Sequence, residues 1–164
     1  MGSEKTKVRL GQAIRKMTAV LIASGGLTGF FPAAPGTCGS VVGVGLIFLG
    51  KDLPLWALVF LVLALLVMGV WAAGEMCQIM KKKDASQVVI DEIVGMMITM
   101  VGLPVTPYWM IGGFLVFRLF DIVKPSPARY FDDKVAGGWG VMMDDVIAGI
   151  YGNILLHFIL RAQI

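Results

Sequence analysis

Long apolar runs separated by short polar segments extend along most of the chain. Residues 54–76 form the longest run, and about 20 apolar residues are enough for a helix to cross a bilayer. A shorter run covers residues 40–50, and Lys51, Asp52 and Pro54 predict a tight break between the two runs. The pattern therefore predicts two adjacent membrane helices, of which 54–76 is the full-length candidate.

Two further apolar runs follow the polar stretch 81–84. They cover residues 88–103 and 108–120 and are joined by "LPVTP", whose prolines interrupt a helix. At ~1.5 Å per residue these runs measure roughly 24 Å and 20 Å, less than the ~30 Å hydrocarbon layer. They are either thin spans or a re-entrant hairpin. A polar loop at 124–140 then precedes a last apolar helix at 141–160.

The composition supports a membrane protein. The 164 residues are 57% hydrophobic and 15% charged, whereas soluble domains carry about 25% charged residues, and the mean hydropathy is +0.83. We predict one all-α domain over residues 1–164, a multi-pass membrane helical bundle with short or re-entrant helices. Residues 1–16 form a polar, basic N-terminal segment, and we expect residues 17–38 to be an interfacial or re-entrant helix followed by a loop.

Basic residues gather in three of the polar segments. They occur in the N-terminal segment, at 81–83 and in the loop 124–140, whereas Lys51 and Arg161 fall at the other ends of the predicted helices. By the positive-inside rule the three basic segments are expected on the cytoplasmic face. No stripe of basic residues with interleaved aromatic residues indicates nucleic-acid binding.

Acidic residues fall at the helix ends that this topology places on that face. They are Asp91 with Glu92, Asp121 next to Arg118 at i, i+3, and Asp144 with Asp145. Acids at helix starts are also favoured by the helix dipole, which would explain one doublet without any site. The dipole does not explain why all three groups converge. Clustered carboxylates repel one another unless a cation or a proton lies between them.

This cluster predicts a metal site for phosphate chemistry. Oxygen ligands, in a chain with one histidine, favour Mg²⁺, which commonly also contacts a substrate phosphate. Basic side chains that could bind phosphate oxygens lie nearby in the sequence, arginine in bidentate fashion. The expected ligands are Asp91, Glu92, Asp121, Asp144 and Asp145, and the expected phosphate binders are Arg118, Lys124 and Arg129.

The loop "PAAPGTCGS" at residues 32–40 has two readings. Backbone N–H groups around Gly36, Thr37 and Ser40 could cradle a phosphate ahead of the apolar helix. The loop could equally be an ordinary turn with Ser40 as the helix N-cap. His157, deep in the last helix, is expected to be a packing or interfacial residue.

Four motifs between residues 35 and 149 resemble one known family. They are "PGTCGS", "DEIVGM", "FRLFDIVKPSPARYFD" and "GGWGVMMDDVIAG", in that order, and together they resemble phosphatidylglycerophosphatase A. The resemblance implies a Mg²⁺-dependent, multi-pass lipid phosphatase of the bacterial inner membrane. Such an enzyme removes the terminal phosphate of phosphatidylglycerophosphate and leaves phosphatidylglycerol, so the implied partners are this lipid substrate and the surrounding membrane lipids.

The resemblance also implies roles for individual residues. The glycine–threonine turn falls on Gly36 and Thr37, which favours the phosphate-binding reading of that loop. The expected catalytic set is Asp91, Glu92, Asp121, Asp144, Asp145 and Arg118, and the expected substrate-binding set is Gly36, Thr37, Ser40, Lys124 and Arg129. A water molecule activated at the carboxylates would attack phosphorus, although an aspartyl-phosphate intermediate remains an alternative.

Two other functions compete with this prediction. A CDP-alcohol phosphotransferase would carry the pattern DGxxAR…GxxxD on one helical hairpin, whereas the acids here are distributed over three helices. A small cation transporter would use Asp91, Glu92 and Asp121 as ion ligands. Ion sites of transporters usually lie near the bilayer midplane, and these acids are predicted at helix ends.

Overall fold

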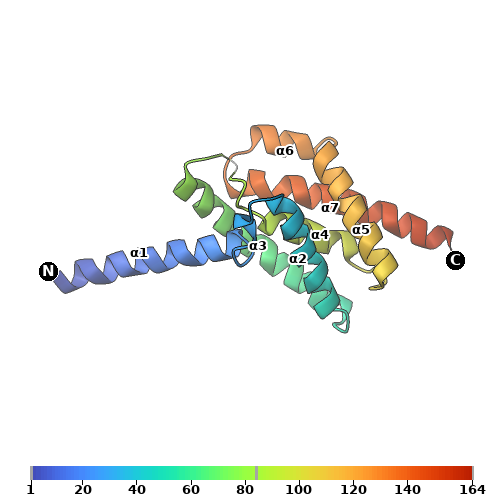
Figure 1. The fold of residues 1–164 in the computed structure, drawn as a ribbon, viewed down its shortest axis with the longest axis horizontal. Helices are drawn as coiled ribbons and strands as arrows, with labels where there is room; N and C mark the ends of the chain where they lie inside the picture. Colours follow the sequence, from blue (N-terminus) through green and yellow to red (C-terminus); the bar gives the residue numbers. More distant parts are fainter. Residues whose placement is uncertain (1, 84, 164) are drawn as a thin grey trace.

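The fold is entirely helical in the part of the chain that the structure describes. The computed structural model describes residues 2–83 and 85–163, without the side chains of 2–6, so Met1, Asp84 and Ile164 lie outside it. The all-α prediction is confirmed. The elements are α1 (Gly2–Ala23), the 3₁₀ turn η1 (Thr28–Phe30), α2 (Pro35–Leu49), α3 (Leu55–Met80), α4 (Ile90–Met100), α5 (Pro107–Val123), α6 (Ala128–Lys134) and α7 (Gly138–Ala162) (Figure 1).

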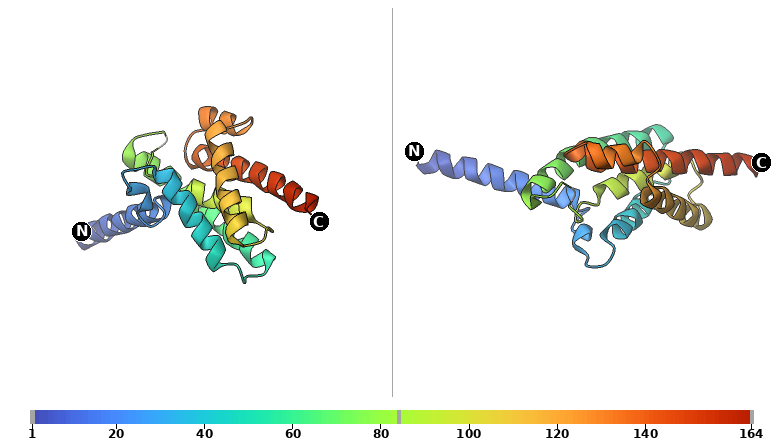
Figure 2. Two further views of the ribbon diagram at one scale, coloured as in Figure 1. Left: turned by 45° about the vertical axis from the view of Figure 1, so that its right-hand side comes forward. Right: turned by 90° about the horizontal axis from the view of Figure 1, so that it is seen from above.

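The short helix α4 forms the centre of the bundle. It packs most extensively against α7 and α2, and it also contacts α3 and α5. Most of its residues are buried, among them Val94, Met96 and Met97. The other helices surround it, while α1 projects away from the bundle and packs along α3 (Figures 1 and 2). Beyond Asp91 and Glu92 in its first turn, the mainly apolar sequence of α4 therefore places it in the core.

Two helices are long and apolar enough to cross a membrane. They are α3, with 26 residues, and α7, with 25 residues. The outer face of α3 leaves Trp56, Phe60 and Val67 exposed by 75%, 71% and 71%, and a soluble protein rarely exposes a continuous apolar face of this kind. Length, composition and exposure together suggest a membrane protein.

The structure corrects several boundaries predicted from the sequence. Residues 54–76 were expected to be the single full-length span, but α7 begins at Gly138 rather than at 141 and is also long enough. The loop 124–140 was expected to be polar without a membrane span, and within it the structure has the short helix α6. Residues 17–38 were expected to be an interfacial or re-entrant helix followed by a loop, and the structure has no separate helix that starts at residue 17. Instead α1 runs unbroken to Ala23, because its first helix-ending residues are Gly25 and Gly26, both with positive φ.

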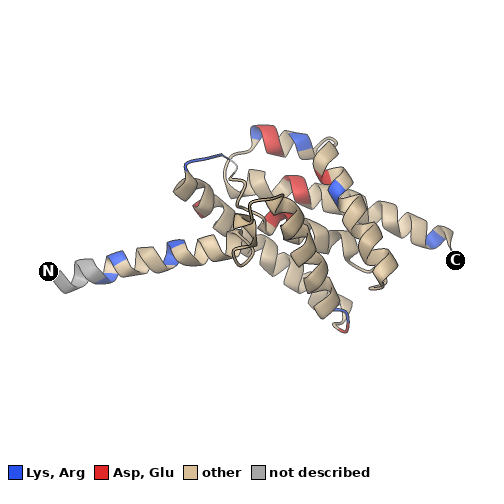
Figure 3. Ribbon diagram, viewed as in Figure 1, with Lys and Arg blue, Asp and Glu red and all other residues tan. Residues whose placement is uncertain are grey.

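The charged segments separate toward opposite ends of the bundle. The lysines of 81–83 and the basic residues of α6 lie on the same side, whereas the turn containing Lys51 lies at the far ends of α2 and α3 (Figure 3). Lys83 contacts α6 directly through two hydrogen bonds. The structure thus brings together two of the three basic segments that the topology argument placed on one face, whereas the basic N-terminal segment lies in α1, which projects away from the bundle.

Candidate functional site

A cavity of about 310 Å³ lies where five helices meet. The N-terminal turns of α2 and α4, the C-terminal end of α5, α6 and the second turn of α7 all contribute to its wall. The loop before α4 adds Lys83 and Ser86. Nearly all the predicted site residues line it: Gly36, Thr37, Asp91, Glu92, Arg118, Asp121, Lys124, Asp144 and Asp145.

Three carboxylates form the centre of this site. One oxygen from each of Asp91, Glu92 and Asp145 lies within 4.8 Å of the other two. Buried oxygens of Asp91, Glu92, Asp144 and Asp145 have no hydrogen-bond partner among the described residues. A buried acceptor without a donor is destabilising, and neighbouring negative charges add repulsion. A bound divalent cation would relieve both costs, and an all-oxygen donor set fits Mg²⁺.

Glycines in α4 and α7 set the distance between these acids. Asp91 and Gly95 are one turn apart on α4, as are Asp145 and Gly149 on α7. A Cβ at Gly149 would lie 2.5 Å from the carbonyl oxygen of Gly95, so the two backbones touch there. Residues at i and i+4 share a helix face. Asp91 and Asp145 therefore face each other one turn beyond the point of contact.

The N-terminus of α2 completes the wall beside the acids. The helix begins at Pro35, so the N–H groups of Gly36 and Thr37 belong to its first turn, where intrahelical acceptors are missing. A Cβ at Gly36 would overlap the carboxylate of Glu92 and would also approach Arg118. Free N–H groups at a helix N-terminus are suited to binding an anion, here directly next to the acidic cluster.

Ser40 does not have the role of N-cap that the turn reading gave it. The N-cap is Ala34, and Ser40 is fully buried in the second turn of α2. Its hydroxyl donates to the carbonyl oxygen of Gly36 at 2.9 Å and accepts from Nη1 of Arg118 at 3.5 Å. Ser40 therefore contacts the guanidinium from behind the cavity and helps to position it.

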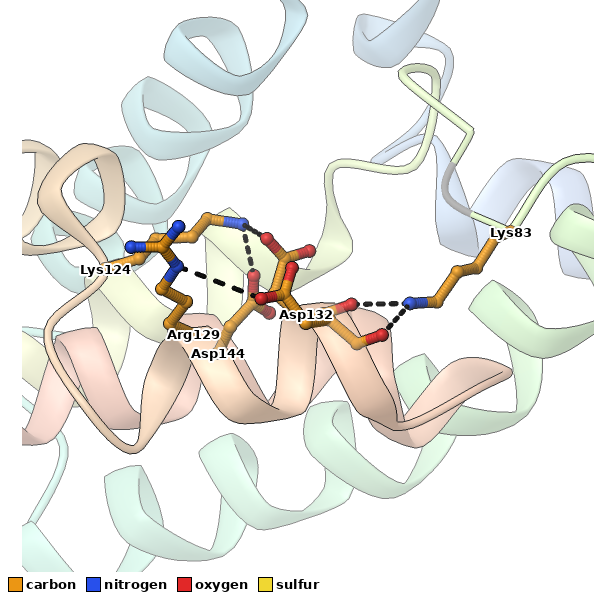
Figure 4. Close-up of polar contacts among 6 residues, drawn as sticks. Lys83, Lys124, Arg129, Asp132 and Asp144 are labelled. Carbon is orange, nitrogen blue, oxygen red and sulfur yellow. Dashed lines mark hydrogen bonds and ion pairs between the residues drawn. The ribbon is translucent and has the colours of Figure 1, made fainter.

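Arg118 and Lys124 hold two of the predicted metal ligands. Nη1 of Arg118 lies 2.6 Å from Oδ2 of Asp121. Nζ of Lys124 lies 2.7 Å from Oδ2 of Asp144 and 3.0 Å from Oδ2 of Asp132 (Figure 4). Burial opposes the charged form of Lys124, but the hydrogen bonds and charges of Asp144 and Asp132 outweigh it and raise its pKa. Lys124 is therefore positively charged at neutral pH.

Sequence reasoning assigned no role to two charged residues of the cavity wall, Lys83 and Asp132. Lys83 served only as a topology signal, yet its Nζ donates to the backbone carbonyls of Asp132 and Asp133 at 2.7 Å and 2.8 Å (Figure 4). These carbonyls belong to the last turn of α6, where helix carbonyls lack intrahelical donors. A prediction of helix α6 could have indicated this contact, because lysine side chains can donate to the free carbonyl groups at a helix C-terminus.

Arg129 lies outside the cavity wall. It is on the exposed side of α6, with 79% of its side chain accessible, and its Nε is 3.8 Å from Oδ2 of Asp133 (Figure 4). The sequence placed it with the phosphate binders because arginine suits phosphate. The helical turn of α6 instead directs it toward solvent, while Asp132 on the same helix faces Lys124.

The position of the second acidic doublet also differs from the prediction. Asp144 and Asp145 were expected to begin the last helix, but α7 starts at Gly138, and they lie in its second turn. The helix dipole acts mainly within the first turn. It can account for Asp91 and Glu92, which are in the first turn of α4, but not for Asp144 and Asp145.

The site and the fold together define a class of protein. An acidic group fitted for a cation, two nearby cations and a free helix N-terminus indicate phosphate chemistry in an all-α protein with two helices that could span a membrane. The family model of phosphatidylglycerophosphatase A matches residues 21–160. The chain therefore belongs to the phosphatidylglycerophosphatase A family, a family of lipid phosphatases.

Curated relatives agree with this assignment. Phosphatidylglycerophosphatase A of Escherichia coli is 39% identical over 141 residues, which cover 85% of this chain and 81% of the relative. Phosphatidylglycerophosphatase A of Haemophilus influenzae is 38% identical over 144 residues, covering 85% and 86%. A Bacteroides thetaiotaomicron protein named "Putative phosphatidylinositol-3-phosphatase" is 43% identical over 148 residues, covering 84% and 90%. No solved structure matches this chain.

Proposed function

We propose that the protein hydrolyses the terminal phosphomonoester of phosphatidylglycerophosphate to phosphatidylglycerol and phosphate. The reaction depends on Mg²⁺ and takes place at the cytoplasmic face of the bacterial inner membrane. The observation that carries the proposal is the group formed by Asp91, Glu92 and Asp145, whose oxygens lie within 4.8 Å of one another in the same cavity as Arg118 and Lys124. Two of the relatives are named for this activity.

The proposed mechanism assigns separate tasks to the two sides of the cavity. Asp91, Glu92 and Asp145 would hold Mg²⁺, with Asp121 and Asp144 next to them. When bound, Mg²⁺ supplies Lewis-acid polarisation of a phosphate oxygen. The first-turn N–H groups of α2 and the guanidinium of Arg118 bind and orient the terminal phosphate, and Lys124 adds a fixed positive charge.

The bond changes follow from this arrangement. A carboxylate of the acidic group takes a proton from a water molecule, and the water oxygen forms a bond to phosphorus. The bond between phosphorus and the lipid oxygen breaks, the protonated carboxyl group returns its proton to that oxygen, and inorganic phosphate is released. Arg118 and Lys124 stabilise the charge that accumulates on the phosphate oxygens in the transition state.

The position of the cavity supports a phosphatase rather than the competing functions. An ion pathway would need polar lining toward both ends of the bundle, whereas the cavity lining comes from one end and includes no residue of the turn 50–54. The acids also come from α4, α5 and α7, not from one hairpin as in a CDP-alcohol phosphotransferase.

A second substrate is favoured by one specific observation. The Bacteroides relative is named for a phosphoinositide. Its named substrate shares a phosphomonoester on a lipid headgroup with phosphatidylglycerophosphate. The cavity recognises phosphate through groups that both lipids would satisfy, so selectivity between them depends on the rest of the headgroup.

Phosphate release by the purified protein tests the proposal. Phosphatidylglycerophosphate and phosphatidylinositol 3-phosphate are each supplied in detergent micelles, with EDTA and then with excess Mg²⁺. We expect release from phosphatidylglycerophosphate that is lost in EDTA and restored by Mg²⁺. Full turnover in EDTA would contradict the metal dependence, and faster release from the phosphoinositide would replace the proposed substrate.

A further inference from the structure

An apolar groove of about 390 Å³ lies between α2 and α5. It is lined from α2 by Val41, Val44 and Phe48, and from the α5 side chiefly by Met110, Ile111 and Phe114. Val41, Phe48 and Ile111 are 56%, 50% and 63% exposed, so the groove opens on the outer surface. The mechanism proposed above makes no use of it.

On both α2 and α5, the residues that line the groove lie on the same helix face as the residues that line the phosphate cavity. On α2, Thr37 lines the phosphate cavity, and Val41, Val44 and Phe48 follow at i+4, i+7 and i+11. These spacings keep all four residues on one helix face.

The same relation holds on α5. Arg118 lines the cavity, and Phe114, Ile111 and Pro107 precede it at i−4, i−7 and i−11. The hydrogen bond from Arg118 to Ser40 joins the two helices at the cavity end. The polar cavity and the apolar groove are therefore successive parts of the same interhelical seam.

The combined length of the cavity wall and the groove along this seam matches one lipid chain. Eleven residues separate Thr37 from Phe48, and the same number separates Arg118 from Pro107, which corresponds to about 16 Å of helix rise. One leaflet is half of the ~30 Å hydrocarbon layer, so an acyl chain reaches about 15 Å.

We propose that the groove between α2 and α5 binds one acyl chain of the lipid whose phosphate occupies the adjacent cavity. This inference rests on the proposed function, because it requires a phospholipid monoester as substrate. A chain seated along the seam fixes the lipid relative to Arg118 and the first turn of α2. The groove therefore determines selectivity for acyl chains, while the cavity reads the phosphate.

Photocrosslinking tests this placement without requiring turnover. The probe is phosphatidylglycerophosphate with a diazirine on one acyl chain, added in EDTA and mapped by mass spectrometry. We expect cross-links at residues 41–48 and 107–114 that are competed by unlabelled phosphatidylglycerophosphate but not by phosphatidylglycerol. If both unlabelled lipids reduced the groove cross-links equally, the groove would bind membrane lipid without regard to its phosphate. That result would overturn the inference. Cross-links confined to other helices would also overturn it.

Chain selectivity supplies a second measurement. Ile111→Trp and Val44→Trp each place a large ring in the groove, and Val67→Trp places the same ring on the exposed face of α3 as a matched control. The two substrates are phosphatidylglycerophosphate with palmitoyl chains and phosphatidylglycerophosphate with hexanoyl chains. In the groove variants we expect the ratio of kcat/KM for the palmitoyl substrate to kcat/KM for the hexanoyl substrate to fall at least about tenfold. The control should keep the wild-type ratio.

The two proposals can fail separately. A wild-type protein that releases no phosphate from either substrate contradicts the proposed function. A wild-type protein that releases phosphate, with groove variants that keep the wild-type ratio of palmitoyl to hexanoyl turnover, contradicts the acyl-chain groove alone. Two groove variants on different helices ensure that poor folding of one does not decide the outcome.

Discussion

Gly36 and Glu92 are in such close contact that position 36 has no room for a side chain. A Cβ there would overlap Oε1 of Glu92. We expect Gly36→Ala to displace this carboxylate and lower kcat/KM for phosphate release at least about tenfold, because small displacements of reacting groups have large effects on rate. Phosphate release in detergent micelles measures the change.

Gly45→Ala on the same helix is the matched control. A Cβ at Gly45 meets no atom within 4 Å, so this variant should keep wild-type activity. It should also stabilise α2 by about 0.5–1 kcal/mol, because alanine is a better helix former than glycine. Equal activity of the two variants would mean that Glu92 tolerates displacement and does not belong to the reacting group.

The repulsion within the acidic group should be visible in thermal stability. In EDTA, Asp145→Asn removes one charge from a buried cluster, so we expect its Tm to rise above that of the wild type. Mg²⁺ should raise the Tm of the wild type and have a smaller effect on the variant, because a ligand that binds the folded state stabilises it. The exposed residue Asp133 provides the control Asp133→Asn, with a wild-type response to Mg²⁺.

Arg118→Lys separates the charge of the residue from its geometry. Both described contacts of Arg118, to Asp121 and to Ser40, use Nη1, so its other donors remain for a phosphate. Lysine keeps the charge and loses the planar fork. We expect kcat/KM to fall at least about tenfold, as for the loss of a directed donor to the transition state, whereas Lys134→Ala in α6 should have little effect. A silent Arg118→Lys would make the residue a structural partner of Asp121.

The orientation in the membrane can be tested with single cysteines. Ser86, which lines the cavity, and Ser126, in the turn between α5 and α6, are both exposed, whereas Lys51 is exposed in the turn between the far ends of α2 and α3. With Cys38 and Cys77 replaced, cysteines at 86 and 126 should react with an impermeant maleimide in inverted vesicles, and one at 51 in right-side-out cells. Reaction of 86 and 126 from opposite faces would contradict the proposed membrane arrangement.

The sequence predicted most of the acidic and basic residues that meet at the site, and the reason lies in helix topology. Asp91 near the start of α4, Asp121 near the end of α5 and Asp145 near the start of α7 were predicted to converge, because the connecting segments return the chain to the same end of the bundle, and all three line the cavity. The start of α2 was harder to predict from the sequence. The segment "PAAPG" is typical of a turn, although proline is also favoured at the first helical position.

Side-chain pairing was harder to predict than convergence. The contact of Lys83 with α6 depends on a helix of seven residues inside a polar segment, which has too few apolar positions for a periodic signal. The exposure of Arg129 follows from the rotation of that same helix. Which acids pair with Arg118 and Lys124, and which remain without a partner, depends on packing distances that spacing alone does not give.

The contact between Gly95 and Gly149 has a consequence for the choice of ion. Because the backbones of α4 and α7 touch at these glycines, the backbone contact fixes the distance between Asp91 and Asp145. The two carboxylates therefore have little freedom to move apart. Mg²⁺ is held at about 2.0–2.1 Å from its oxygens, whereas Ca²⁺ requires about 2.3–2.6 Å and more ligands. A site with fixed walls should therefore discriminate by ionic radius, and the larger ion should be a poor substitute even though it carries the same charge.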